Sequence, residues 1–103
     1  MKCKITRNAA KVIQRMLSEA EGQDTEGRKL RVIITHQHGD HAHYGLTLDN
    51  PTDKDETVMT DKGIEVILER DQPLLDGVKI DYLYFPYERF VITNPSKGHV
   101  EEH

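Results

Sequence analysis

Six histidines are the residues of this 103-residue sequence with the clearest chemical potential, and they fall in two short segments. Four of them share the eight-residue stretch HQHGDHAH, as His36, His38, His41 and His43. The other two stand close together further along the chain, as His99 and His103. Imidazole nitrogens are good ligands for zinc, iron, copper and nickel. The first segment is therefore a candidate metal site.

The spacing of these histidines favours coordination of a single ion. Residues two apart in an extended chain project from the same face, about 6.6 Å apart, so His36 and His38 can approach one cation. The same holds for His41 and His43, and Asp40 between the two pairs offers a carboxylate. We therefore predict a mononuclear iron or zinc site that draws on seven residues: His36, His38, Asp40, His41, His43, His99 and His103.

Two other interpretations of these residues are open. The first segment can be a polar surface loop that binds nothing, with His99 and His103 in a disordered tail. Alternatively, HQHGDH resembles the His-x-His-x-Asp-His signature of the metallo-β-lactamase-like hydrolases, which implies a small metal-dependent hydrolase using His36, His38, Asp40 and His41. That fold is much longer and needs further histidines downstream, whereas none lies between His43 and His99. We therefore expect that the chain is not an enzyme.

Composition narrows the classes of partner and compartment. The formal net charge is -4 and no basic stripe is visible, which argues against a nucleic-acid partner. No apolar stretch approaches the roughly 20 residues that span a bilayer, so no membrane segment is expected. The first residues, MKCKI, lack the apolar core of a secretory signal, and we expect a cytoplasmic protein. The single cysteine, Cys3, excludes a thiolate-only metal site within one chain and is expected to be a small buried residue.

The first third of the chain predicts a strand followed by a helix. Residues 2–5 alternate in polarity and end at Thr6, which is suited to cap a helix. Over residues 7–21 the apolar side chains recur at steps of three and four, as expected of an amphipathic helix. Gly22 is a natural stop, and residues 23–28 are a polar loop. The helix therefore has one face available to cover a core.

The rest of the chain predicts short strands separated by turns. Alternation of apolar and polar residues marks strands over 30–34, 44–48, 78–84 and 90–93, and 58–60 with 64–69 form a hairpin around a glycine turn. Pro73 to Gly77 is a short turn, and the acidic segment 49–56 is expected to be a solvated loop. The fold class is thus mainly β with one N-terminal amphipathic helix (α+β), as a small sandwich or distorted barrel. We expect one domain over 1–95 and a polar, flexible tail over 96–103.

Several strings in this order resemble the HesB/IscA-like family of A-type iron-sulfur cluster assembly proteins. They are residues 61–66 (DKGIEV), 75–77 (LDG), 80–82 (IDY) and 90–95 (FVITNP), together with the opening helix from Thr6 to Leu17. The resemblance implies a HesB-like sandwich, a homo-oligomer, and partners among iron-sulfur assembly or acceptor proteins. The aromatic stretch of Tyr82, Tyr84, Phe85 and Tyr87 is expected to pack on the core or on a partner subunit.

The departures from that family concern the site itself. Its members carry one cysteine in a glycine-flanked loop and two more near the C-terminus, positions that fall near Gly39, Glu101 and His103 here. None of these positions is a cysteine in this sequence. Iron-sulfur clusters require thiolates, so a cluster is not expected within one chain. We expect a non-enzymatic relative of the cluster-biosynthesis proteins in which a histidine-rich loop replaces the cysteines, or a degenerate partner-binding module without metal.

Overall fold

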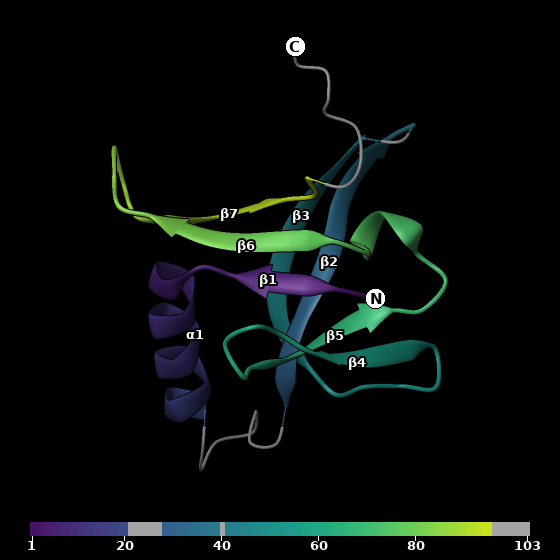
Figure 1. Cartoon of the computed structure of the whole chain (residues 1–103), viewed down its shortest axis with the longest axis horizontal. Helices are drawn as coiled ribbons and strands as arrows, with labels where there is room; N and C mark the ends of the chain where they lie inside the picture. Colours follow the sequence, from purple (N-terminus) through teal and green to yellow (C-terminus); the bar gives the residue numbers. More distant parts are fainter. Residues whose placement is uncertain (21–27, 40, 96–103) are drawn as a thin grey trace.

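The computed structural model of the protein describes residues 1–20, 28–39 and 41–95. Within these residues the chain forms seven strands, one α-helix and one short 3-10 helix (Figure 1). In chain order they are β1 (Cys3–Ile5), α1 (Arg7–Ala20), β2 (Lys29–His38), β3 (His41–Asp49), β4 (Asp55–Met59), β5 (Glu65–Glu69), η1 (Pro73–Leu75), β6 (Val78–Leu83) and β7 (Arg89–Thr93). The expected class, mainly β with one N-terminal helix, is confirmed.

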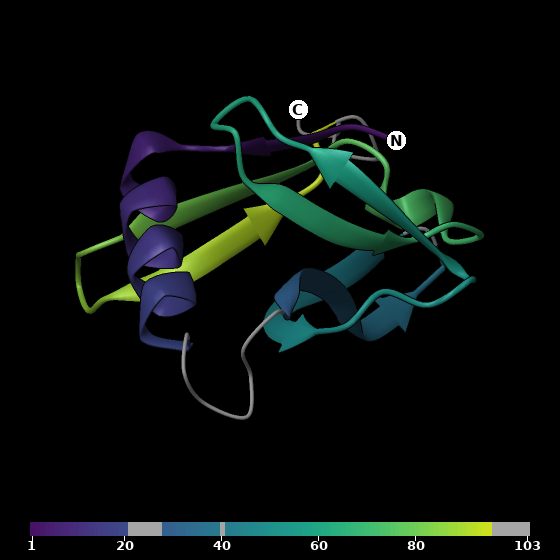
Figure 2. The same cartoon turned by 90° about the horizontal axis from the view of Figure 1, so that it is seen from below.

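The strands belong to two sheets that share one core. The three-stranded sheet has the order β1-β6-β7, and the four-stranded sheet has the order β3-β2-β5-β4. Two neighbouring pairs are parallel, β1 with β6 and β2 with β5, and the other pairs are antiparallel. Buried side chains from both sheets and from α1 form one hydrophobic cluster. The described strands thus form an open sandwich and not a closed barrel (Figure 2).

Helix α1 begins where the sequence predicts it. The Thr6 hydroxyl accepts a hydrogen bond from the backbone N–H of Ala9 at 3.3 Å, which satisfies one of the free donors at the helix start. Ala9 and Ile13 are fully buried, whereas Lys11 on the opposite face is exposed. The helix therefore packs against the core through its apolar face. The predicted stop at Gly22 and the tail 96–103 lie outside the described residues.

The strands around the histidines are longer than predicted. β2 continues through His38, beyond the predicted end before His36, and β3 begins at His41 instead of Tyr44. The histidine-rich segment is therefore the end of a β-hairpin and not a loop. Its backbone remains extended because the two strands pair along their whole length, from Lys29 opposite Asp49 to His38 opposite His41.

The prediction for the acidic segment 49–56 is wrong at its end. The sequence favours a solvated loop, but β4 begins inside this segment at Asp55, and the Asp55 side chain is only 2% exposed. The predicted hairpin that follows is confirmed as β4 and β5, joined by a turn in which Gly63 has a φ of 74°. No helix in the described part of the chain is long and apolar enough to cross a membrane.

Candidate metal site at the tip of the β2–β3 hairpin

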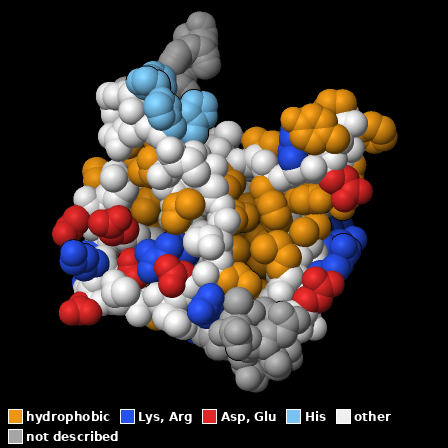
Figure 3. Space-filling view, turned by 180° about the vertical axis from the view of Figure 1, so that it is seen from behind, with side chains coloured by type: hydrophobic (Ala, Val, Ile, Leu, Met, Phe, Trp, Pro, Cys, Tyr) orange, Lys and Arg blue, Asp and Glu red, His pale blue; other side chains and the backbone are white. Residues whose placement is uncertain are grey.

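The β2–β3 hairpin presents four histidines on one face. His36 lies opposite His43 in the strand pairing, and His38 lies opposite His41. Directly paired residues share a face of the sheet, and so do residues two apart on one strand. All four side chains are exposed, and Figure 3 shows the histidines gathered at one projecting end of the molecule. The strand pairing therefore places all four histidine positions on one face of the hairpin.

A bulge and a glycine turn set this arrangement. The pairing register shifts between Ile34 and His36, and the Thr35 hydroxyl donates a hydrogen bond to the His43 carbonyl at 3.3 Å. At the turn Gly39 has a φ of 59°, a left-handed conformation that glycine adopts without steric cost. Gln37, which points to the opposite face, donates a hydrogen bond from its side-chain amide to the Gly39 carbonyl at 3.0 Å.

Three of the imidazoles lie close together. The Nε2 atoms of His36 and His38 are 2.6 Å apart, and their ring centroids are 4.3 Å apart in an edge-to-face arrangement. The ring centroids of His36 and His43 are 6.1 Å apart. A hydrogen bond between two ring nitrogens needs one N–H donor and one unprotonated acceptor, and the tautomers of the two rings set which is which.

This geometry is near that of a metal site without matching it. Two nitrogens bound at about 2.0–2.1 Å to one tetrahedral zinc ion lie about 3.3 Å apart, farther than the 2.6 Å between His36 and His38. The tautomer with the proton on Nδ1 leaves both Nε2 atoms free to bind, and a small rotation of the rings would open that separation. Within the described residues, no group of three or more His, Cys, Asp or Glu side chains is already arranged to hold a metal ion.

The remaining predicted ligands are Asp40, His41, His99 and His103. Asp40, His99 and His103 lie outside the described residues. His41 is described, is exposed, and lies opposite His38 in the strand pairing. The part of the site that the structure describes is therefore an all-imidazole set.

Cys3 does not contribute a ligand to this site. It lies in β1 of the other sheet with 5% of its surface exposed, as expected of a small core residue. Burial, with a smaller effect from the Asp61 carboxylate, raises the pKa of the Cys3 thiol to about 12. A thiol in that state is neither a nucleophile nor a metal ligand at neutral pH. The residues described at the hairpin tip therefore do not fit an iron-sulfur cluster held by thiolates.

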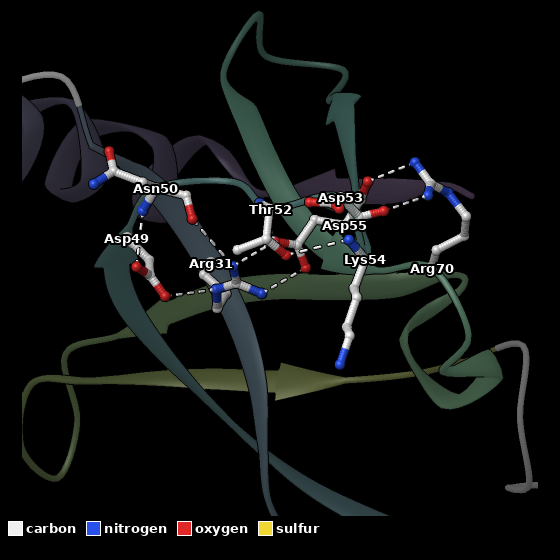
Figure 4. A network of polar contacts seen from close by, with 8 residues as sticks. All are labelled: Arg31, Asp49, Asn50, Thr52, Asp53, Lys54, Asp55 and Arg70. Carbon is white, nitrogen blue, oxygen red and sulfur yellow. Dashed lines mark hydrogen bonds and ion pairs between the residues drawn. The ribbon is translucent and has the colours of Figure 1, made fainter.

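The sequence did not reveal the ion-pair network at the base of the same hairpin (Figure 4). Arg31 on β2 binds Asp55 through two hydrogen bonds and Asp49 on β3 through a third, from its Nε at 3.0 Å. The hydrogen bonds from Arg31 hold the pKa of Asp55 well below its usual range, against the opposing effect of burial. Thr52 adds a backbone and a hydroxyl hydrogen bond to the same carboxylate.

Solved structures identify the class of fold. Escherichia coli SufA, described as involved in biosynthesis of iron-sulfur clusters, aligns with a TM-score of 0.63 and 21% identity over 92% of this chain and 87% of its own. A structure of IscA with the [2Fe-2S] cluster aligns with a TM-score of 0.65 and 20% identity over 90% of this chain and 85% of its own. The protein therefore has the fold of the A-type iron-sulfur assembly proteins.

Sequence relatives identify the family. Iron-sulfur cluster insertion protein ErpA 2 of Methylococcus capsulatus is 33% identical over 90% of this chain and 71% of its own length. Iron-sulfur cluster insertion protein ErpA of Buchnera aphidicola is 36% identical over 90% of this chain and 83% of its own. No family model matches the sequence. The chain belongs to the A-type, HesB/IscA-like family of iron-sulfur cluster assembly proteins. It is thus placed among cluster-assembly proteins and not among hydrolytic enzymes, as the sequence analysis expected.

Proposed function

We propose that this chain is an A-type family protein whose hairpin tip binds one divalent metal ion, iron or zinc, through histidines in place of an iron-sulfur cluster bound through cysteines. His36, His38 and His43 would supply the first ligands, and His41, Asp40, His99 and His103 are further candidates. In this role the protein would handle metal for iron-sulfur assembly or acceptor proteins in the cytoplasm.

The observation that carries this proposal is the common face of the four histidines on β2 and β3. Four imidazoles at the end of a paired hairpin are held by backbone hydrogen bonds, so little order has to be gained when a metal ion binds. Neutral imidazole is a good ligand for both proposed metals. The absence of a cysteine at these positions argues for a single ion and against a cluster.

The test is the metal content of the purified, untagged protein, prepared both with and without oxygen. We expect about one zinc or iron ion per chain and no sulfide-dependent visible absorption. The double variant His36→Gln/His38→Gln is expected to lower metal affinity by about 100-fold, since it removes two ligands. The variant Thr47→Ala is the control, because Thr47 is exposed on β3 of the same hairpin, away from the histidine tip.

Three outcomes would overturn the proposal. One is the absence of bound metal at micromolar excess of zinc and of iron. Another is equal affinity in the double variant and the wild type. The third is a stable sulfide-containing chromophore, which would show that the protein binds a cluster. Turnover of ester, lactam or phosphoester substrates by the metal-loaded protein would instead support the hydrolase alternative.

We further propose that the protein is a homo-oligomer that uses the apolar surface beside the β6–β7 turn. Tyr84, Phe85 and Tyr87 are 45%, 85% and 65% exposed. Arg89 holds this turn by donating hydrogen bonds to the carbonyls of Phe85 and Tyr87 at 2.6 and 2.9 Å. Rigid exposed aromatic residues are typical of interface centres. Figure 3 shows hydrophobic side chains spread widely over this side of the molecule.

The mass of the protein in solution tests this second proposal. By light scattering the wild type is expected at a multiple of 11.9 kDa. The variant Phe85→Ser/Tyr87→Ser is expected to shift toward the monomer. Met59→Ser is the control, because Met59 is 61% exposed on a different strand. A monomeric wild type, or an unchanged mass in the double variant, would contradict the proposal.

A further inference from the structure

A group of unpaired lysines lies on the outer side of the three-stranded sheet, which carries none of the histidines. Lys4 on β1 is the direct register partner of Lys79 on β6, and Lys2 precedes Lys4 by two residues. All three side chains are exposed. We call these three residues the lysine face.

The lysine face is electrostatically unfavourable without a partner. Like charges directly opposite each other on neighbouring strands destabilise a sheet. Two other surface lysines are paired, Lys29 with Glu65 and Lys62 with Asp61, each within 3.2 Å. Within the described residues, no ion pair or side-chain hydrogen bond involves the ammonium groups of Lys2, Lys4 or Lys79. In a chain with net charge -4, these three neighbouring ammonium groups are thus without a salt-bridge partner among the described residues.

The same three lysines surround a depression in the surface. Its volume is about 340 Å³, and its other lining residues are Cys3, Gly77, Val78 and Pro95. Cys3 and Val78 face the core and are 5% and 0% exposed, so Pro95 and the aliphatic parts of the lysine side chains supply the apolar surface of the depression, and the ammonium groups stand at its rim. This arrangement of an apolar centre and a charged rim is that of a protein interface.

The geometry favours an extended acidic peptide over a small anion. Alternate side chains of an extended strand are about 6.8 Å apart, so carboxylates two residues apart match the spacing of Lys2 and Lys4. Lys79 can meet the same segment from the neighbouring strand. A tightly held phosphate would need converging backbone N–H groups, but the N–H of Gly77 donates to the Lys2 carbonyl and the N–H of Lys2 donates to Asp76.

We propose that the lysine face binds an extended segment of a partner protein in which acidic residues alternate with small apolar residues. The ammonium groups pair with the alternating carboxylates, and the small residues between them point away from the sheet, as alternate residues of an extended strand do. This interaction does not involve the histidines, so it is independent of the proposed metal site.

A short synthetic peptide serves as the probe. The chain contains no tryptophan, so the fluorescence anisotropy of acetyl-Trp-Glu-Ala-Glu-Ala-Glu-amide reports the peptide alone. We expect binding at about 20 mM salt that weakens about tenfold at about 200 mM salt, because the charges are exposed to solvent. The peptide with glutamine in place of each glutamate is expected not to bind.

Matched variants locate the binding site. Lys4→Gln/Lys79→Gln is expected to weaken binding about tenfold or more, since it removes two of the three cations. Lys11→Gln/Lys54→Gln makes the same change in net charge at exposed positions elsewhere and is expected to bind as the wild type does. Unchanged melting temperatures for both variants would show that the loss of peptide binding does not result from unfolding.

Other results would overturn the proposal. If peptide affinity fell equally in the two double variants, only the net charge of the protein would matter. If affinity fell in neither variant, the peptide would bind at another surface. Binding of the glutamine peptide would show that the carboxylates of the peptide are not needed for binding. Inorganic tripolyphosphate that binds to Lys2, Lys4 and Lys79 more tightly than the peptide does would assign the site to a small anion instead of a partner protein.

Discussion

The guanidinium of Arg31 forms two hydrogen bonds with the buried carboxylate of Asp55, from Nη1 to Oδ1 at 2.8 Å and from Nη2 to Oδ2 at 2.6 Å. Arg31 belongs to β2 and Asp55 to β4, which are separated in the sheet by β5. The third bond of Arg31, to Asp49, reaches β3. One side chain thus connects the histidine hairpin to the opposite edge of its sheet (Figure 4).

Replacement of Asp55 by asparagine is expected to destabilise the fold strongly. The change leaves Arg31 without its buried counter-charge, and loss of one partner of a buried pair costs about 3 kcal/mol or more. Urea denaturation measures this loss. Asp53→Asn is the control, because the Asp53 side chain is exposed two residues away. Equal stability of the two variants would show that the ion pair contributes little.

The stability of the protein is expected to fall in acid because of the same carboxylate. The pKa of Asp55 is lowered in the folded state, so its contribution is fully present above about pH 3.9, the unfolded value of aspartate. That contribution is lost as the pH falls below this value toward the folded pKa. Urea denaturation from pH 6 to pH 2 should show a smaller decline for Asp55→Asn than for the wild type. Parallel curves would assign acid sensitivity to other groups.

Gly63 is expected to tolerate asparagine better than alanine. Its φ of 74° is left-handed, and nothing lies within 4 Å of the position that a Cβ would take, so backbone strain alone sets the cost. Alanine should cost about 1 kcal/mol, whereas asparagine visits this region more readily and should cost less. Thermal denaturation of the two variants tests the order. The reverse order would mean that side-chain contacts in the β4–β5 turn outweigh the backbone conformation.

Cys3 is expected to be unreactive in the folded protein. Its thiol is buried and its pKa is raised to about 12, so the thiolate fraction at pH 8 is very small. Modification by a disulfide reagent should proceed at least about 100-fold faster in denaturant than in the native state. Metal content should also be unchanged in Cys3→Ala if Cys3 lies outside the metal site. Rapid labelling of the native protein would contradict the buried position.

The elements that were predicted correctly are those marked by a pattern of residues that are close together in the sequence. The steps of three and four before Gly22 identify α1, and the glycine turn at Gly63 identifies the β4–β5 hairpin. The shared face of the histidines also follows from local spacing, since a strand repeats every two residues. The continuation of β2 through His38 was missed because histidine and glutamine carry no apolar alternation.

Other features depend on partners that are distant in the sequence. Asp55 resembles part of a solvated acidic run because its partner, Arg31, lies 24 residues earlier. The parallel pairing of β1 with β6 joins residues 75 positions apart, such as Lys4 and Lys79, so the lysine face could not be seen in the sequence. The 2.6 Å contact of His36 and His38 depends on side-chain rotamers, which residue spacing does not determine.

The two ends of the β2–β3 hairpin differ in burial. Its base carries Arg31 and the buried residues Leu30 and Val32, while its end carries the exposed histidines and a glycine turn. Substitutions of the exposed side chains at the end therefore leave the buried residues of the base in place. For protein engineers, the end of the hairpin is thus a position where exposed side chains can be exchanged at little risk to the scaffold.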